Sequence, residues 1–239
     1  MHQGELPLSV APPPSGWQAF RRHRRLAVSV AKNLASVRDR ITRAGGDPDE
    51  ITIVAVTKGF GPEVCKQALE AGLRELGENR VQEALEKMGQ VQGGEWHLIG
   101  HLQTNKVRLA ARRFALIQSI DSQHLVQALA RADPAQRVLV EVNVAREPQK
   151  SGVDPDKAAA LIDEAAKALQ LRGLMAMGPT SGDPKPAFTE LKTMRDAAQE
   201  RLGISLPILS MGMSSDFEDA VRAGSTMLRL GSVLFGPRP

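Results

Sequence analysis

The sequence predicts an α/β protein: a single (β/α)8 barrel of the TIM type with an additional helix on its N-terminal side. Eight short apolar segments alternate with seven amphipathic helical patterns, and one further helical pattern precedes the first apolar segment. A doubly wound open sheet is the main alternative. It usually has fewer strands, and the glycine fingerprint G-x-G-x-x-G is missing after the first apolar segment.

The length and composition suit one large domain. The chain has 239 residues, of which 42% are hydrophobic, and no linker marks a second domain. We therefore assign residues 16–239 to the barrel and expect residues 1–15, which contain Pro12-Pro13-Pro14, to form a disordered leader. Without a long apolar run or a convincing secretion signal, we expect a cytoplasmic protein with no membrane partner.

The first helical pattern carries most of the positive charge. Residues 17–45 contain eight Lys and Arg against one Asp, a net charge of +7, whereas the whole chain carries +4. Apolar residues at helical spacing predict one packed face and one solvated face, and they are Leu26, Val30, Leu34, Val37 and Ile41. Because no aromatic residues interleave with the arginines, we do not expect a nucleic-acid partner.

The predicted strands and helices follow in order along the chain. The strands are short, mostly apolar runs at Ile51–Lys58, Glu75–Glu78, Trp96–His101, Leu116–Ile120, Val138–Val144, Gly173–Met177, Ile208–Met211 and Met227–Leu230. The helices between them are amphipathic and cover residues 62–72, 80–90, 105–113, 122–132, 155–169, 187–202 and 215–223.

A lysine ends the first predicted strand. Lys58 follows an apolar run that is typical of a strand buried on both faces. Burial lowers the pKa of an amine, and a neutral amine attacks an aldehyde to form a Schiff base. The alternative is a lysine that closes the strand and reaches into water.

Polar residues gather at the carboxyl ends of the predicted strands, which form the working face of a barrel. They are Lys58, Glu78, Asn79, His101, Asp121, Glu141, Asn143, Ser214, Ser215, Arg229 and Ser232. Polar groups at one rim of an otherwise apolar barrel indicate a small-molecule site.

The last two loops indicate an anion site. Ser214-Ser215-Asp216 is expected to cap a short helix whose first N–H groups are free to bind an anion. Gly231 lets the backbone approach a ligand closely, and Ser232 adds a hydroxyl. Barrels often hold phosphate in the loops after strands seven and eight. An ordinary helix cap and an ordinary turn glycine are the alternative.

Phosphate loops opposite a strand-end lysine predict pyridoxal phosphate as the cofactor. The aldehyde would join Lys58, and the phosphate would lie at Ser214, Gly231 and Ser232. Arg229 is expected to project inward toward the pyridine nitrogen, where an arginine keeps that nitrogen unprotonated and weakens the ring as an electron sink. A barrel-lining salt bridge with Glu141 is the alternative for Arg229.

The histidines and the single cysteine do not predict a metal site. His97 and His101 are four residues apart, but on a strand and not on a helix that carries H-E-x-x-H. A structural role, or a cofactor contact by His101, is favoured over zinc. Cys65 is expected on the helix after the first strand as a packing residue.

Longer motifs run through the chain at Ala55–Lys58, Leu76–Glu83, Trp96–Lys106, Gly173–Met177, Leu209–Asp216 and Leu228–Gly236. Together they resemble the YggS/PROSC group, the pyridoxal phosphate homeostasis proteins, over roughly residues 20–238. The departure at Ala145-Arg146-Glu147-Pro148 affects the loop that leads to Lys150.

The resemblance implies a barrel like the N-terminal domain of alanine racemase, with the cofactor on Lys58 and Asn79 nearby. It also implies that the protein binds, buffers and delivers pyridoxal phosphate, with pyridoxal phosphate-dependent apoenzymes as recipients. The family is regarded as lacking an established catalytic activity. Whether Lys150 offers a second amine is left open.

The composition agrees with a protein that is not an enzyme. Alanine racemases add a C-terminal β-domain that brings a tyrosine as second base, whereas this chain has no tyrosine and ends at Pro239. Racemisation needs a proton acceptor on each face of the substrate, and only Lys58 is an obvious one. We therefore favour a monomeric cofactor carrier. A racemase or lyase of narrow scope is the first alternative, and a phosphate-binding barrel enzyme without cofactor is the second.

Overall fold

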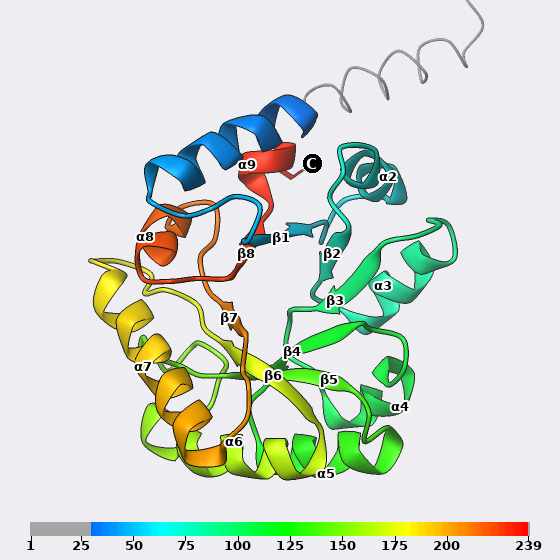
Figure 1. The fold of residues 1–239 in the computed structure, drawn as a ribbon. Helices are drawn as coiled ribbons and strands as arrows, with labels where there is room; N and C mark the ends of the chain where they lie inside the picture. Colours follow the sequence, from blue (N-terminus) through cyan, green and yellow to red (C-terminus); the bar gives the residue numbers. More distant parts are fainter. Residues whose placement is uncertain (1–29, 239) are drawn as a thin grey trace, which may run out of the picture.

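The computed structural model describes residues 30–238, which form a closed barrel of eight parallel strands surrounded by helices (Figure 1). Each strand pairs with the next one along the chain, and β8 pairs with β1 to close the ring. The predicted fold class is confirmed. The predicted leader, residues 1–15, and the basic residues before Val30 lie outside the described residues.

The strands agree with the prediction at their centres, but several end earlier than expected. They are β1 (Thr52–Val56), β2 (Glu75–Glu78), β3 (Glu95–Leu98), β4 (Leu116–Ile120), β5 (Arg137–Glu141), β6 (Gln170–Met175), β7 (Ile208–Ser210) and β8 (Met227–Leu230). Because β1 ends at Val56, Lys58 lies in the turn that follows the strand and not on the strand itself.

The helices that cover the barrel are α2 (Pro62–Glu70), α3 (Val81–Met88), α4 (Val107–Ala110), α5 (Gln123–Ala132), α6 (Pro155–Ala168), α7 (Lys185–Leu202), α8 (Phe217–Arg222) and α9 (Ser232–Phe235). The predicted helix over residues 105–113 is shorter than expected, since it consists of the 3-10 turn η1 (Thr104–Lys106) and α4. The prediction missed α9, because a helix of one turn is too short to produce a periodic apolar pattern.

Apolar side chains pack in two regions. The larger core lies between the strands and the helices, and it includes Cys65, which is fully buried as predicted. The smaller cluster fills the barrel interior and consists of Val54, Leu116, Leu139, Met175 and Met227. Leu116 and Met227 are the first residues of their strands, Val54 and Leu139 lie in the middle of theirs, and Met175 is the last residue of β6. The apolar filling therefore extends from the amino ends of the strands toward their carboxyl ends.

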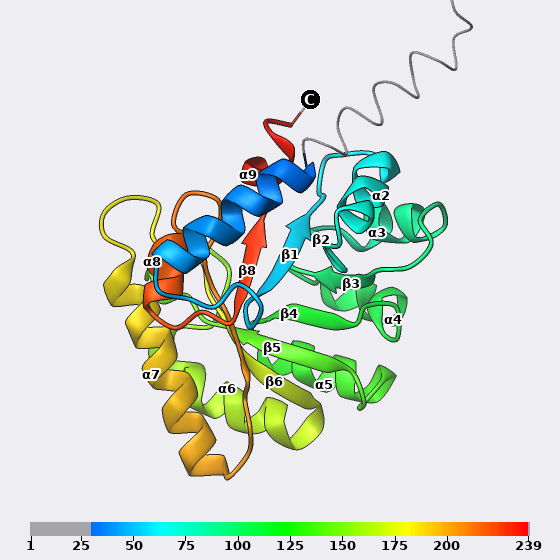
Figure 2. The same cartoon turned by 45° about the horizontal axis from the view of Figure 1, so that its top comes forward.

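An amphipathic helix over residues 30–43 packs against α8 and α9 (Figure 2). Its buried face includes Val37 and Ile41, as the spacing predicted. Arg40 forms a bidentate ion pair with Glu218, with distances of 2.9 and 3.0 Å. The helix therefore covers the outer surface of the barrel next to β8 and β1. Within residues 30–238, no helix is both long and apolar enough to cross a membrane.

Candidate functional site

A cavity of about 720 Å³ opens at the carboxyl ends of the strands. This volume is in the range of small-molecule sites. Its lining contains all seven residues that the sequence singled out for a cofactor, namely Lys58, Asn79, His101, Ser214, Arg229, Gly231 and Ser232. These seven residues come from five different strand ends or the loops after them, and they meet in one pocket, as the barrel topology requires.

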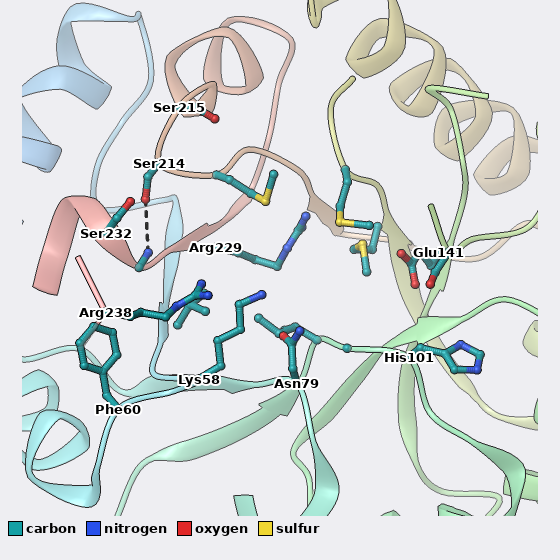
Figure 3. Close-up of a pocket in the computed structure, with 18 of the residues that line it drawn as sticks. Lys58, Phe60, Asn79, His101, Glu141, Ser214, Ser215, Arg229, Ser232 and Arg238 are labelled. Atoms are coloured by element: carbon teal, nitrogen blue, oxygen red, sulfur yellow. Dashed lines mark hydrogen bonds between the residues drawn. The ribbon is translucent and has the colours of Figure 1, made fainter. Parts of the chain in front are cut away.

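Lys58 points its ammonium group into this pocket (Figure 3). Burial lowers the pKa of Lys58, and the positive charges of Arg238 and Arg229 lower it further. A carboxylate at Glu78 acts in the opposite direction but is the weakest of these influences. A larger fraction of this amine is consequently neutral near pH 7 than for a lysine in water, which is the condition for attack on an aldehyde.

Arg229 is buried in the barrel wall, with 5% of its surface exposed. Its Nη1 donates to the carbonyl and hydroxyl oxygens of Ser210, at 2.9 and 2.8 Å, and its Nη2 donates to the carbonyl of Ala176 at 2.8 Å. Burial lowers the pKa of Arg229 to about 10, while Glu141 and Asp216 partly offset this effect. The guanidinium is thus fixed in place and still charged at neutral pH.

The alternative salt bridge between Arg229 and Glu141 is absent from the ion pairs among the described residues. Instead, Arg229 belongs to a chain of hydrogen bonds. The hydroxyl of Ser210 donates to Oε1 of Gln118 at 2.7 Å, and Nε2 of Gln118 lies 3.0 Å from Nδ1 of His97. Burial lowers the pKa of His97 to about 4, so this histidine is neutral and accepts the hydrogen bond. His97 therefore has the structural role that the sequence favoured.

The loops after β7 and β8 meet through Ser214. Its Oγ accepts hydrogen bonds from the backbone N–H groups of Gly231 and Val233, at 3.4 and 3.3 Å. The expectation that Ser214 stands at the start of the following helix needs a correction, because α8 begins at Phe217 with Asp216 in the capping position. Ser214 reaches across to the first turn of α9 because the chain still turns through residues 214–216 before α8 begins.

His101 and Asn79 border the pocket on the β2 and β3 side. The His101 side chain is 52% exposed, and its Nδ1 lies 3.0 Å from a carboxylate oxygen of Asp121. Its ring points away from Lys58 in Figure 3. Asn79 directly follows β2 and is partly buried at the pocket wall. Of the two, Asn79 faces the region around Lys58 more directly.

The pocket contains two charged residues that the sequence did not single out for the cofactor. Glu141 ends β5 with only 2% of its surface exposed, and no described residue donates a hydrogen bond to its carboxyl group. Burial raises the pKa of Glu141 to about 7. Arg238, beyond α9, adds a positive charge beside Lys58. Glu141 was predicted at the polar rim but not as a cofactor contact, and Arg238 was not predicted at all, because a chain-end arginine has no distinctive sequence pattern.

Lys150 lies outside the pocket lining. Its Nζ donates to the carbonyl of Gly178 at 2.6 Å and pairs with Glu147 at 3.1 Å. These contacts join the loop after β5 to the loop after β6. Among residues 30–238, no group of three or more His, Cys, Asp or Glu side chains is arranged to hold a metal ion.

Comparison with known proteins gives consistent matches over most of the chain. A family model for the N-terminal domain of alanine racemase matches residues 28–239. The pyridoxal phosphate homeostasis protein of Escherichia coli (strain K12) is 38% identical over 233 residues, which cover 87% of this chain and 97% of the relative. A protein of the same name from Aquifex aeolicus (strain VF5) is 36% identical over 226 residues, covering 88% and 99%. The chain belongs to the family of pyridoxal phosphate homeostasis proteins.

Solved structures support this family membership. PipY of Synechococcus elongatus PCC7942, in a structure with pyridoxal phosphate bound, is 33% identical with a TM-score of 0.77, covering 87% of this chain and all (100%) of that one. Alanine racemase from Corynebacterium glutamicum gives a TM-score of 0.72 at 19% identity, covering 89% of this chain and 61% of that chain, a likeness of fold alone. The resemblance to the homeostasis family that the motifs indicated is confirmed.

Proposed function

We propose that this protein binds pyridoxal phosphate reversibly on Lys58 and holds, buffers and delivers it within the cell. One observation carries the proposal: an amine whose pKa is lowered by burial shares a pocket with Ser214, Ser215 and Ser232, the hydroxyl residues of the loops after β7 and β8. The pyridoxal phosphate bound to PipY and the names of the relatives as pyridoxal phosphate homeostasis proteins point in the same direction.

The pocket residues fit this cofactor in charge and chemistry. When bound, pyridoxal phosphate supplies an aldehyde that a neutral amine can attack to form a Schiff base, and it carries an anionic phosphate. Lys58 provides the amine. Ser214, Gly231 and Ser232 would hold the phosphate with hydroxyl and backbone groups, and the positive charge of Arg238 lies on the same side of the pocket (Figure 3).

Arg229 would border the pyridine nitrogen. Its contacts with Ser210 and Ala176 keep the guanidinium from moving, and its charge at neutral pH disfavours a proton on a neighbouring ring nitrogen. The ring is then a weak electron sink, which suits a carrier better than an enzyme of amino-acid chemistry. Asn79 and His101 would complete the cofactor contacts from β2 and β3.

The experiment is a titration of the cofactor-free protein with pyridoxal phosphate. We expect an absorbance band near ~420 nm, as an imine of this cofactor gives, and its loss in Lys58→Ala. Lys150→Ala is the control and keeps the band. A Lys58→Ala protein with an undiminished band would remove Lys58 as the anchor. Delivery is tested by timing cofactor transfer to an apoenzyme against free diffusion, and transfer no faster than release into solution would leave buffering alone.

A second candidate function is a racemase or lyase of narrow scope. The observation that favours it is Glu141, a pocket carboxyl with a pKa of about 7 that could accept a proton. Incubating the loaded protein with D- and L-amino acids in deuterated water tests it. We expect no exchange of the α-proton, whereas exchange that Glu141→Gln abolishes would establish the enzyme.

The remaining expectations concern setting and partners. We propose a monomer in the cytoplasm whose partners are pyridoxal phosphate and the apoenzymes that receive it, with no nucleic-acid or membrane partner. Light scattering of the purified protein at several concentrations tests the oligomeric state, and a mass that doubles with concentration would contradict it.

A further inference from the structure

Both peptide groups that flank Lys58 are held by one ion pair behind the pocket. The ammonium of Lys87 donates to the carbonyl oxygen of Thr57 at 2.9 Å, and Glu83 Oε1 accepts from the backbone N–H of Gly59 at 2.9 Å. Lys87 and Glu83 are themselves 2.8 Å apart. Because the peptide before Lys58 and the peptide after it are both planar, fixing both of them fixes the backbone angles of Lys58.

A buried carboxylate extends this arrangement. Glu78 Oε1 accepts from the Thr57 hydroxyl at 2.6 Å and from Lys87 at 2.7 Å. The Lys87 ammonium thus uses its three donors on Thr57, Glu78 and Glu83. Burial lowers the pKa of Lys87, but the hydrogen bonds to the two carboxylates outweigh it and raise the pKa overall, so the ammonium stays charged.

None of these side chains lines the pocket. Glu78 and Lys87 are 0% and 5% exposed, and the pocket wall contains neither them nor Thr57 and Glu83. Lys87 and Glu83 instead contact the peptide groups on either side of Lys58, which does line the pocket. The turn needs such support, since Gly59 has a φ of +76° and is exposed, and it has no buried side chain to anchor it.

We propose that Glu83, together with Lys87, is a positioning residue for Lys58: it holds the turn so that the amine faces the pocket in the direction needed for cofactor attachment. This inference rests on the proposed function. The direction of an attacking group matters because a displacement of about 1 Å can cost on the order of 100-fold in rate.

Four variants test the inference. Glu83→Ala removes the acceptor for Gly59, and Glu83→Asp keeps the charge but shortens the side chain. Glu83→Gln retains an oxygen in the same place. Glu86→Ala is the matched control, since Glu86 is an exposed residue of the same helix, α3, with no side-chain hydrogen bond to a described residue.

Two readouts separate positioning from general stability. The first is amide hydrogen exchange of Gly59 in the cofactor-free protein, which we expect to rise about tenfold in Glu83→Ala and Glu83→Asp. The second is the dissociation constant for pyridoxal phosphate, expected to rise about tenfold in the same two variants. Glu83→Gln and Glu86→Ala should stay within about threefold of the parent in both. Thermal unfolding identifies any variant that does not fold. If Glu83→Ala does not fold, the comparison of Glu83→Asp with the parent tests the inference in its place.

The results separate this inference from the proposed function. If Glu83→Asp binds the cofactor within twofold of the parent, or if Glu83→Gln is as impaired as Glu83→Ala, the positioning role is wrong even though the parent binds. If the parent itself takes up no pyridoxal phosphate, the proposed function fails, and the exchange of Gly59 still decides whether Glu83 holds the turn.

Discussion

Replacing Glu141 with glutamine should change how the stability of the protein depends on pH. The Glu141 carboxyl is 2% exposed, and burial raises its pKa from about 4.5 to about 7. The folded protein therefore binds this proton more tightly than the unfolded chain. The resulting stabilisation is complete below pH 4.5 and is lost as the pH rises through 7. The size of the pKa change corresponds to about 3 kcal/mol.

Urea unfolding of parent and Glu141→Gln at pH 4.5 and pH 8, followed by circular dichroism, measures this effect. Glutamine does not titrate, so the free energy of unfolding of Glu141→Gln should increase relative to that of the parent by about 3 kcal/mol from pH 4.5 to pH 8. Other titrating groups are common to both proteins and cancel in the comparison. A stability difference that is the same at both pH values would refute the argument that Glu141 is buried without an adequate partner.

Three further predictions concern the barrel interior and the pocket. Burial lowers the pKa of His97 to about 4, so the stability that neutral His97 contributes is present above pH 6.5, and about 3 kcal/mol of it is lost as the pH falls to 4. In urea unfolding, His97→Gln should abolish this loss of stability. A loss that is the same in the variant would contradict the prediction. Arg238→Gln should raise the pKa of Lys58 and move the pH profile of colour formation with pyridoxal phosphate to higher pH; the exposed Arg108→Gln is its control, and a profile that does not move speaks against the electrostatic effect. Ser214→Ala should weaken pyridoxal phosphate binding about tenfold, as for one lost hydrogen bond to a charged group, while pyridoxal without phosphate binds as before; equal losses for both would place Ser214 away from the phosphate.

The sequence was sufficient to predict the barrel, because the patterns that indicate its strands and helices are local and repeat along the chain. Each apolar run is followed by an amphipathic helix, and a parallel sheet with this alternation has few ways to close. Lys58 and the loops around Ser214 and Gly231 could be singled out for the same reason, since strand ends of a barrel share one face. That Lys58, Ser214 and Arg229 share one face follows from the topology, whereas the turn that carries Lys58 and the contact of Ser214 with Gly231 could not be predicted.

The supporting contacts could not be predicted, because they depend on how distant segments pack. Glu83 and Lys87 are four residues apart on a helix, a spacing that usually indicates an exposed ion pair. Only the packing of α3 behind the turn after β1 brings Lys87 to the Thr57 carbonyl. Likewise, Ser210 has no sequence feature that marks it as the partner of Arg229.

The central claim is that Lys58 is the amine to which pyridoxal phosphate becomes attached. The most direct measurement is reduction of the loaded protein with borohydride, followed by peptide mapping to locate the pyridoxyl group. We expect the group on Lys58 at one equivalent of cofactor, with Lys150 unmodified. A pyridoxyl group found mainly on Lys150 or on an exposed lysine such as Lys185 would contradict the account.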